Sequence, residues 1–458
     1  MVTEHADAPG RGIRMPETRR ERGREARQTA PRRSLPAWGS FERTHDALET
    51  VLAQNGIRDG EIVGLRHTRM AASPWNFFRG GAAIMAADLA SRPSSGIEVQ
   101  LAGDAHVLNF GLWATPERNL AFDVRDFDET LPGPFEWDLL RLTASLRIAA
   151  QVDRLSKERA EAAVEAAIEA YCTRMREYAR MPELDIWYDG MHIAHLEEFF
   201  QPADRGRLRI RVEKGRSSRT SRGAFAKLTD FHEGRPRIIP NPPIRSALDD
   251  AAQTAIATEL FASYRESLGE ERQVMFDRFQ QDDVVRQIVG VGSVGMRVHL
   301  ALFEGRNGAD PLFLQAKQAT ASVYEPHLGP SRHAHHGQRV IVGKRLIQSA
   351  TDVFAGWAHF QGHDYYVRQF RDMKIVPRIS FLAPRLVEFA TACGATLARA
   401  HARTGDPVEI DGYLGSGRAF ARGVAEFARA YAAQNERDHA QLAAAVAAGG
   451  VPVLAEPE

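Results

Sequence analysis

Hydrophobic positions in the first two thirds of the chain predict helices separated by short strands. Apolar residues at three- and four-residue spacing predict helices over 77–89, 137–150, 157–178 and 248–279. Short apolar runs beside turn residues predict a strand, loop and strand over 97–111 and a further strand over 120–124. Residues 202–245 are basic and are interrupted by Gly, Ser and Pro, so we expect loops or hairpins there.

The pattern changes in the last third of the chain. Alternating apolar and polar residues with Gly-rich turns predict strands over 284–303, 311–319 and 364–370. Helical spacing returns at 385–403 and again, with many Ala, at 417–447. The chain is therefore predicted to be α+β. Its apolar runs fall short of the roughly 18 residues that cross a bilayer, so we expect no membrane partner.

Charge and cysteine usage narrow the class of protein. The 458 residues contain 59 basic and 59 acidic residues, and this balance argues against a nucleic-acid partner. Residues 1–40 hold nine Arg without apolar periodicity, so we expect a disordered, solvated tail and no secretory signal. The two cysteines, Cys172 and Cys393, form no disulfide framework or zinc site, which fits a reducing cytoplasm.

The densest candidate chemistry lies between residues 101 and 138. Asp104 follows a predicted strand, and Asn109 comes five residues later on the same loop. Asp126 and Asp128 follow the next short strand, and Asp138 opens a helix. Carboxylate and amide oxygens around one cleft suit Mg²⁺, which usually shares its site with phosphates. A carboxylate that the metal does not use can orient a hydroxyl or accept its proton.

The segment GDAHVLNFG resembles the catalytic loop of the aminoglycoside and choline phosphotransferases. The shared pattern Gly-Asp-x-His-x-x-Asn falls on Gly103, Asp104, His106 and Asn109. In that family a metal-binding Asp follows a strand, and a second Asp opens a helix twelve residues later. The resemblance implies that Asp104 is the catalytic Asp, that Asn109 and Asp126 are Mg²⁺ ligands, and that Asp138 is a buried anchor under the loop.

A kinase-like site also needs a Gly-rich loop and a strand Lys that bind the phosphates. The chain has only six Lys, and the first, Lys157, lies after the acidic loop. Residues 290–295 read GVGSVG and supply Gly290, Gly292, Ser293 and Gly295. A strand, a turn and a second strand with Lys317 follow, which is the order of the kinase small lobe. Glu325 is the default acidic partner for Lys317.

This order predicts a two-lobed, protein-kinase-like fold that is circularly permuted, since the catalytic loop precedes the nucleotide-binding strands. Permutation is tolerated where the original termini are close. We expect four regions: a tail over 1–40, a catalytic-loop half with large-lobe helices over 41–280, a small β-rich nucleotide lobe over 281–380, and C-terminal helices completing the large lobe over 381–458.

Several segments are also similar to an uncharacterised bacterial family, domain of unknown function 2252. The similarity covers about residues 60–445 and includes NFFRGGAAIMAADLA, GDAHVLNFG, FDVRDFDET, GVGSVG, LQAK and YYVRQFRDMK. It supports the kinase-like interpretation but implies no substrate.

The pattern therefore predicts an ATP- and Mg²⁺-dependent phosphotransferase whose hydroxyl acceptor, a small molecule or a protein, stays open. Transfer of AMP would use the same residues. Two other classes stay open, a metal-dependent phosphoesterase and a non-catalytic nucleotide-binding pseudokinase. Arg79, in FFRGG, could bind substrate phosphate, anchor a carboxylate, or lie on a helix surface.

Overall fold

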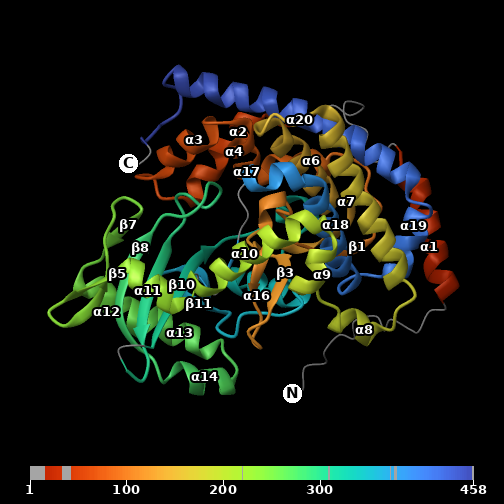
Figure 1. The fold of residues 1–458 in the computed structure, drawn as a ribbon. Coiled ribbons are helices and arrows are strands. Elements are labelled where there is room, and N and C mark those ends of the chain that lie inside the picture. Colours follow the sequence, from red (N-terminus) through yellow and green to blue (C-terminus); the bar gives the residue numbers. More distant parts are fainter. Residues whose placement is uncertain are drawn as a thin grey trace, which may run out of the picture.

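The computed structural model describes residues 16–33, 43–218, 220–307, 310–371, 373–375 and 379–455. The fold is α+β and has a helical part and a β-sheet part that lie side by side (Figure 1). In the described chain, no helix combines the length and the apolar character that crossing a membrane requires.

An antiparallel sheet of six strands forms the core of the β-sheet part. The strand order is β11-β12-β10-β9-β8-β7. The bounds are β7 Arg245–Ala247, β8 Gln280–Gln287, β9 Val298–Glu304, β10 Pro311–Ala319, β11 Gly356–Phe360 and β12 His363–Gln369. In the register, Lys317 of β10 lies opposite Val298 of β9 and Tyr366 of β12. Directly paired residues share a face of the sheet, so these three side chains point the same way.

Helices that precede β8 cover one face of this sheet. They are α12 (Asp250–Ala255), a π-helical turn (Ile256–Leu260), α13 (Phe261–Glu266) and α14 (Glu270–Phe276). Phe261, Tyr264 and Phe276 pack with Phe303 in one hydrophobic cluster. The predicted boundary at residue 280 is therefore too late, because β7 and these helices already belong to the β-sheet part.

Residues 202–245 are more ordered than their composition predicts. They form α10 (Pro202–Ser218), α11 (Ser221–Leu228) and the hairpin of β5 (Thr229–His232) and β6 (Arg235–Ile238). Leu208 and Val212 of α10 are one helical turn apart and both buried, while Thr220 caps α11 through the N–H of Gly223 at 3.0 Å. The loop prediction was wrong for the helices because Arg, which dominates α10, is itself a good helix former.

Five helices build the core of the helical part: α6 (Glu136–Val152), α7 (Lys157–Tyr178), α18 (Leu386–Ala402), α19 (Pro407–Leu414) and α20 (Arg418–Ala447). The predicted bounds of α7 are confirmed, and those of α20 hold to within one residue. Helices α7 and α18 pack closely, because a Cβ atom on Gly394 would lie 2.0 Å from the carbonyl oxygen of Ala167.

Shorter elements surround this core. Two ribbons pair β1 (Glu98–Leu101) with β4 (Leu131–Pro134) and β2 (Phe110–Ala114) with β3 (Leu120–Val124). The single helix expected over 77–89 is interrupted at Gly81, between α4 and α5. The remaining helices are α2 (Ala47–Ala53), α3 (Val63–Ala71), α4 (Pro74–Gly80), α5 (Ala82–Ala90), α8 (Glu183–Tyr188), α9 (Ile193–Glu198), α15 (Glu325–Leu328), α16 (His336–Ile347) and α17 (Ile379–Leu382).

The expected disordered tail contains a packed helix, α1 (Pro16–Thr29), which lies beside α19 at the right edge of Figure 1. Arg19 donates to both carboxylate oxygens of Asp406, at 2.6 and 2.8 Å, and Arg22 lies 3.0 Å from Glu409. The prediction was wrong for residues 16–33 because acidic residues nearly 400 positions away neutralise the Arg-rich helix. Residues 1–15 and 34–40 lie outside the described residues.

Two helical glycines should respond in opposite ways to replacement by Ala, one in the contact between α1 and α19 and one on α10. A Cβ atom on Gly23 would lie 2.0 Å from the carbonyl oxygen of Glu409, whereas a Cβ on Gly206 of α10 would have no neighbour within 4 Å. We expect Gly23→Ala to lower the free energy of unfolding by about 1–3 kcal/mol through overpacking. Gly206→Ala should raise it by about 0.5–1 kcal/mol. Melting temperatures of both variants check this, and equal shifts in one direction would contradict the close packing of α1.

Candidate functional site

The loop after β1 is held from below by a buried carboxylate. Asp138, in the first turn of α6, accepts the N–H groups of Ala102 at 2.7 Å and Gly103 at 3.0 Å, and it is 1% exposed. Gly103 has a φ of +86°, and a side chain there would meet the backbone oxygen of Glu129 at 2.4 Å. The carboxylate and the glycine together fix the conformation of this loop.

Asp104 projects from this loop with its carboxylate held on one side. Arg141 of α6 donates through Nε to Oδ1 of Asp104 at 2.9 Å. Asn109 donates to the backbone oxygen of Asp104 at 2.8 Å, and its Nδ2 lies 3.5 Å from Oδ2. Asn109 is itself 5% exposed and is not one of the described residues that line the cleft above Asp104. The structure therefore brings the two predicted residues together, but only Asp104 faces the cleft.

His106 is a buried neighbour of Asp104. Its Nε2 lies 3.7 Å from Oδ2 of Asp104, and its ring meets Trp75 edge-on with centroids 5.9 Å apart. Burial lowers the pKa of His106 to about 4, and the pull of Asp104 in the other direction is smaller. The imidazole is therefore neutral at pH 7.

Asp126 and Asp128 follow β3 and face the sheet. Burial acts to raise the pKa of Asp126, but Lys317, Arg368, Lys374 and Arg125 outweigh it and hold the pKa at about 2. Asp128 forms an ion pair with Lys317, and its other carboxylate oxygen is buried without a hydrogen-bond partner in the described structure. Both predicted residues thus present acceptor oxygens to one cleft.

Lys317, near the end of β10, is buried and paired with Asp128. Burial acts to lower its pKa, but Asp128, Tyr366 and Asp126 raise it overall, so the amine stays charged. The predicted pairing with Glu325 is wrong. Glu325 instead accepts the N–H of Ser322 at 2.9 Å and lies 3.7 Å from Nε of Arg339, because α15 turns it away from β10.

The Gly-rich segment lies between β8 and β9, and Gly292 and Ser293 line the cleft. Gly290 and Gly295 have φ values of +68° and +88° but are not among the described residues that line it. Two arginines from the N-terminal part of the chain hold this segment: Arg58 donates to the carbonyl oxygen of Val294 at 2.5 Å, and Arg69 donates to that of Gly290 at 2.6 Å.

Two arginines complete the cleft. The sequence did not single out Arg58, which lies before α3, and it left the role of Arg79 of α4 open. Single Arg residues carry little information in a chain with 53 Arg. Both line the cleft, and burial lowers the pKa of each. Glu129 and Asp128 face Arg58, whereas Asp104 and Asp126 face Arg79.

Glu129 is a further lining residue that sequence reasoning missed. One of its carboxylate oxygens accepts the N–H of Val323 at 2.8 Å. Burial raises the pKa of Glu129 to about 7, against the opposing effects of that hydrogen bond and of Arg339. It immediately follows the Asp126–Asp128 pair, so the run DFDE could have drawn attention to it.

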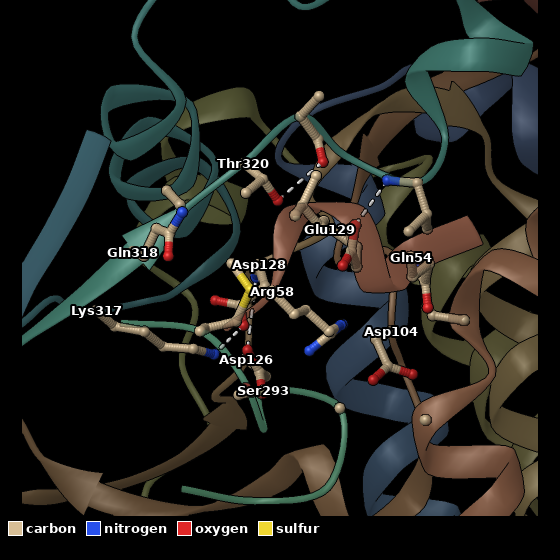
Figure 2. A pocket seen from close by; sticks show the side chains of 18 of the residues that line it. Gln54, Arg58, Asp104, Asp126, Asp128, Glu129, Ser293, Lys317, Gln318 and Thr320 are labelled. Atoms are coloured by element: carbon tan, nitrogen blue, oxygen red, sulfur yellow. Dashed lines mark hydrogen bonds and ion pairs between the residues drawn. The ribbon is translucent and has the colours of Figure 1, made fainter. Parts of the chain in front are cut away.

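The assembled cleft holds acidic and basic side chains from distant segments (Figure 2). Figure 2 shows Lys317 reaching from its strand towards Asp126 and Asp128, with Asp104 farther along the same cleft. The carboxylate oxygens fit Mg²⁺, and the unpartnered oxygen of Asp128 is a ready ligand atom. Gly292, Ser293, Lys317 and the two arginines offer donors suited to phosphate.

A second group of possible metal ligands lies apart from this cleft, at the N-terminus of α16. The ligand atoms of His335, His359 and Asp364 all lie within 4.8 Å of one another. Nδ1 of His335 accepts the N–H of Gln338 at 3.2 Å, so in the neutral ring the other nitrogen carries the hydrogen and faces Asp364 at 3.4 Å. Asp364 is hydrogen-bonded to Nδ1 of His359 at 2.8 Å, whereas Nε2 of His335 has no hydrogen-bond partner in the described structure.

Residues 58–445 match a family of bacterial proteins, described as "Uncharacterized protein conserved in bacteria (DUF2252)", and the chain belongs to that family. No curated protein matches the chain. No solved structure matches it either.

The low pKa of His106 predicts a pH-dependent loss of stability. Below its ordinary pKa of 6.5, the unfolded state binds a proton at this position while the folded state does not until about pH 4. The free energy of unfolding should therefore fall by roughly 2 kcal/mol between pH 6.5 and pH 5 because of this residue. His106→Gln should show a smaller decrease in melting temperature between pH 7 and pH 5 than the wild type. Parallel pH profiles would contradict the buried, neutral imidazole.

Proposed function

We propose that the protein is an ATP- and Mg²⁺-dependent phosphotransferase acting on a hydroxyl group. One observation carries this proposal: Asp104, the Asp126–Asp128 pair, Ser293 and Lys317 line a single cleft although they come from three separate parts of the chain. Phosphoryl transfer depends mainly on positioning and charge neutralisation, and this set of side chains supplies both.

The chain order supports a circularly permuted, kinase-like arrangement as part of this proposal. Strand β8, the Gly-rich segment, β9 and β10 with Lys317 follow one another, and α16, β11, β12 and α18 come next. This is the order of a kinase small lobe and of the helix before a catalytic loop. The loop with Asp104 lies near the start of the chain instead of after α18.

The basic residues of the cleft would hold the phosphates. Lys317 would exchange part of its contact with Asp128 for phosphate oxygens, and the backbone at Gly292 and Ser293 would cover them. Arg58 and Arg79, which also line the cleft, would neutralise further charge. Because these cations are already buried beside carboxylates, they need little reorganisation to bind an anion.

Asp126 and Asp128 would hold Mg²⁺, and Asn109 would be a further ligand. Mg²⁺, when bound, supplies charge neutralisation and orientation of phosphate oxygens. Asn109 reaches this role only through a change of side-chain orientation, since it now donates to Asp104.

Asp104 would orient the acceptor hydroxyl and accept its proton. Arg141 occupies Oδ1, so Oδ2 is the oxygen directed to the acceptor. Glu129, with its pKa of about 7, can take up or release a proton near neutral pH in the same cleft.

Nucleotide binding should depend both on Lys317 of β10 and on Asp126 in the segment after β3. We expect MgATP at 100 times its Kd to stabilise the wild type by about 2.7 kcal/mol, a shift of a few degrees in melting temperature. Lys317→Met and Asp126→Asn should each lose this shift. Lys227→Met, which removes an exposed Lys of α11, should keep it. If neither ATP nor ADP shifts the wild type, the proposal fails, and hydrolysis of phosphate monoesters becomes the next activity to measure.

Turnover should depend on Asp104 while binding does not. We expect Asp104→Asn to keep the MgATP shift and to lower transfer by about 10²–10⁴-fold, because it removes the proton acceptor. Parallel assays with ATP labelled at the γ- or α-phosphate distinguish phosphoryl from AMP transfer to candidate acceptors. If the acceptor is labelled only from ATP that carries the label on its α-phosphate, the reaction is AMP transfer and not phosphoryl transfer. Binding without label transfer in the wild type would indicate a non-catalytic nucleotide-binding protein.

A further inference from the structure

Two imidazoles and a carboxylate lie together where the N-terminus of α16 meets the hairpin of β11 and β12. His335 caps α16, whereas His359 of β11 and Asp364 of β12 are directly paired across the hairpin. Directly paired residues share a face of a sheet, so the hairpin holds this imidazole and the carboxylate side by side. The helix brings the second imidazole to the same point.

Both imidazoles converge on one oxygen of Asp364. Its Oδ2 accepts the N–H of His336 at 2.8 Å, which fixes the direction of the carboxylate. Its Oδ1 lies 2.8 Å from Nδ1 of His359 and 3.4 Å from Nε2 of His335. That Nε2 is buried and has no hydrogen-bond partner in the part of the chain that the structure describes. A metal ion between the three side chains would give this nitrogen a partner.

The spacing of the three groups fits tetrahedral coordination. Ligands that lie about 2.0–2.1 Å from a zinc ion are roughly 3.3–3.4 Å apart in a tetrahedral site. His335 and Asp364 already have this separation. The 2.8 Å between His359 and Asp364 is shorter and must lengthen when an ion replaces the hydrogen between them. The side chain of His359 is 59% exposed, so it is free to make this adjustment, and a water molecule can reach the fourth position.

We propose that His335, His359 and Asp364 form a binding site for a divalent transition-metal ion such as Zn²⁺. Imidazole nitrogens and a carboxylate oxygen are typical Zn²⁺ ligands, whereas Mg²⁺ requires oxygen ligands. In each ring the hydrogen then lies on the nitrogen that faces away from the ion. For His335 this nitrogen is Nδ1, so the N–H of Gln338 loses its acceptor when the ion binds. The ion thus exchanges one capping bond of α16 for a bond between the helix and the hairpin.

A metal ion at this position would also act on the acidic cleft through α16. Arg339 lies one helical turn after His335 and donates to the carbonyl oxygens of Asp128 and Thr320. An ion that ties the start of α16 to the hairpin therefore steadies the helix that holds the acidic segment. Binding of the ion does not depend on whether the cleft transfers phosphate.

Metal titration of the full chain, without a histidine tag and stripped by a chelator, tests this site. We expect one equivalent of Zn²⁺ to bind and to raise the melting temperature in a saturable way. Co²⁺ in place of Zn²⁺ should give the visible absorption of tetrahedral coordination. The ring centroids of His335 and Trp357 are 6.5 Å apart, so Co²⁺ should also quench tryptophan fluorescence. Trp357→Phe should lose most of this quenching and keep the absorption.

Two ligand variants and one control decide the assignment. His335→Asn removes the imidazole but keeps a side chain that caps helices well, and His359→Gln alters an exposed side chain of an edge strand. We expect each to weaken Zn²⁺ binding at least tenfold and to remove the tetrahedral Co²⁺ absorption. His195→Gln should bind as the wild type does, although it removes one ring of a neighbouring pair, His192 and His195, whose centroids lie 6.2 Å apart.

Far-UV circular dichroism identifies a variant that fails to fold. The proposal is overturned if Zn²⁺ gives no saturable response in the wild type. It is also overturned if the response survives in both ligand variants, since the ion then binds elsewhere, for example at the carboxylates of the acidic cleft.

Discussion

The burial of Lys317 is the constraint on which the rest of the site depends. A charged amine on the inner face of a sheet is tolerated only beside carboxylates, and Asp126 and Asp128 come from the segment after β3. Removing one member of such a pair leaves an uncompensated charge and typically costs about 3–5 kcal/mol. Arg339 of α16 strengthens the same junction by donating to the carbonyl oxygens of Asp128, Thr130 and Thr320. The two parts of the fold therefore meet at a fixed place.

Regular periodicity made much of the fold predictable from the sequence. The apolar spacing of 157–178 and the short run at 120–124 gave α7 and β3 with the bounds that the structure shows. Composition gave wrong predictions for segments that are stabilised by residues far away in the sequence. The Arg-rich α1 is ordered because Asp406 and Glu409 lie against it, and no local pattern contains those residues. For the same reason the predicted start of the β-sheet part is too late. The sequence of α12–α14 indicates helices but does not show that they pack on the sheet.

The candidate site, too, could be predicted from the sequence only in part. Asp104, Asp126 and Asp128 could be named because they follow short strands, and Lys317 because it lies in a strand after the Gly-rich segment. Which charges pair with each other could not be read from spacing. Lys317 contacts Asp128, and Glu325 faces Arg339, because the turn at α15 directs it away from β10. Arg58 had no local signal, and Glu129 was missed although it directly follows Asp128, since both lie in the cleft because of how distant segments pack.

Contacts from the N-terminal part of the chain fix the conformation of the Gly-rich segment. Arg58 and Arg69 hold its carbonyl groups, and the N–H of Asp59 donates to Gly295 at 2.8 Å. A segment ordered before its ligand arrives loses little conformational entropy on binding, which favours affinity. Those contacts come from residues more than 220 positions earlier in the chain, so the order of this segment depends on the folding of the N-terminal part.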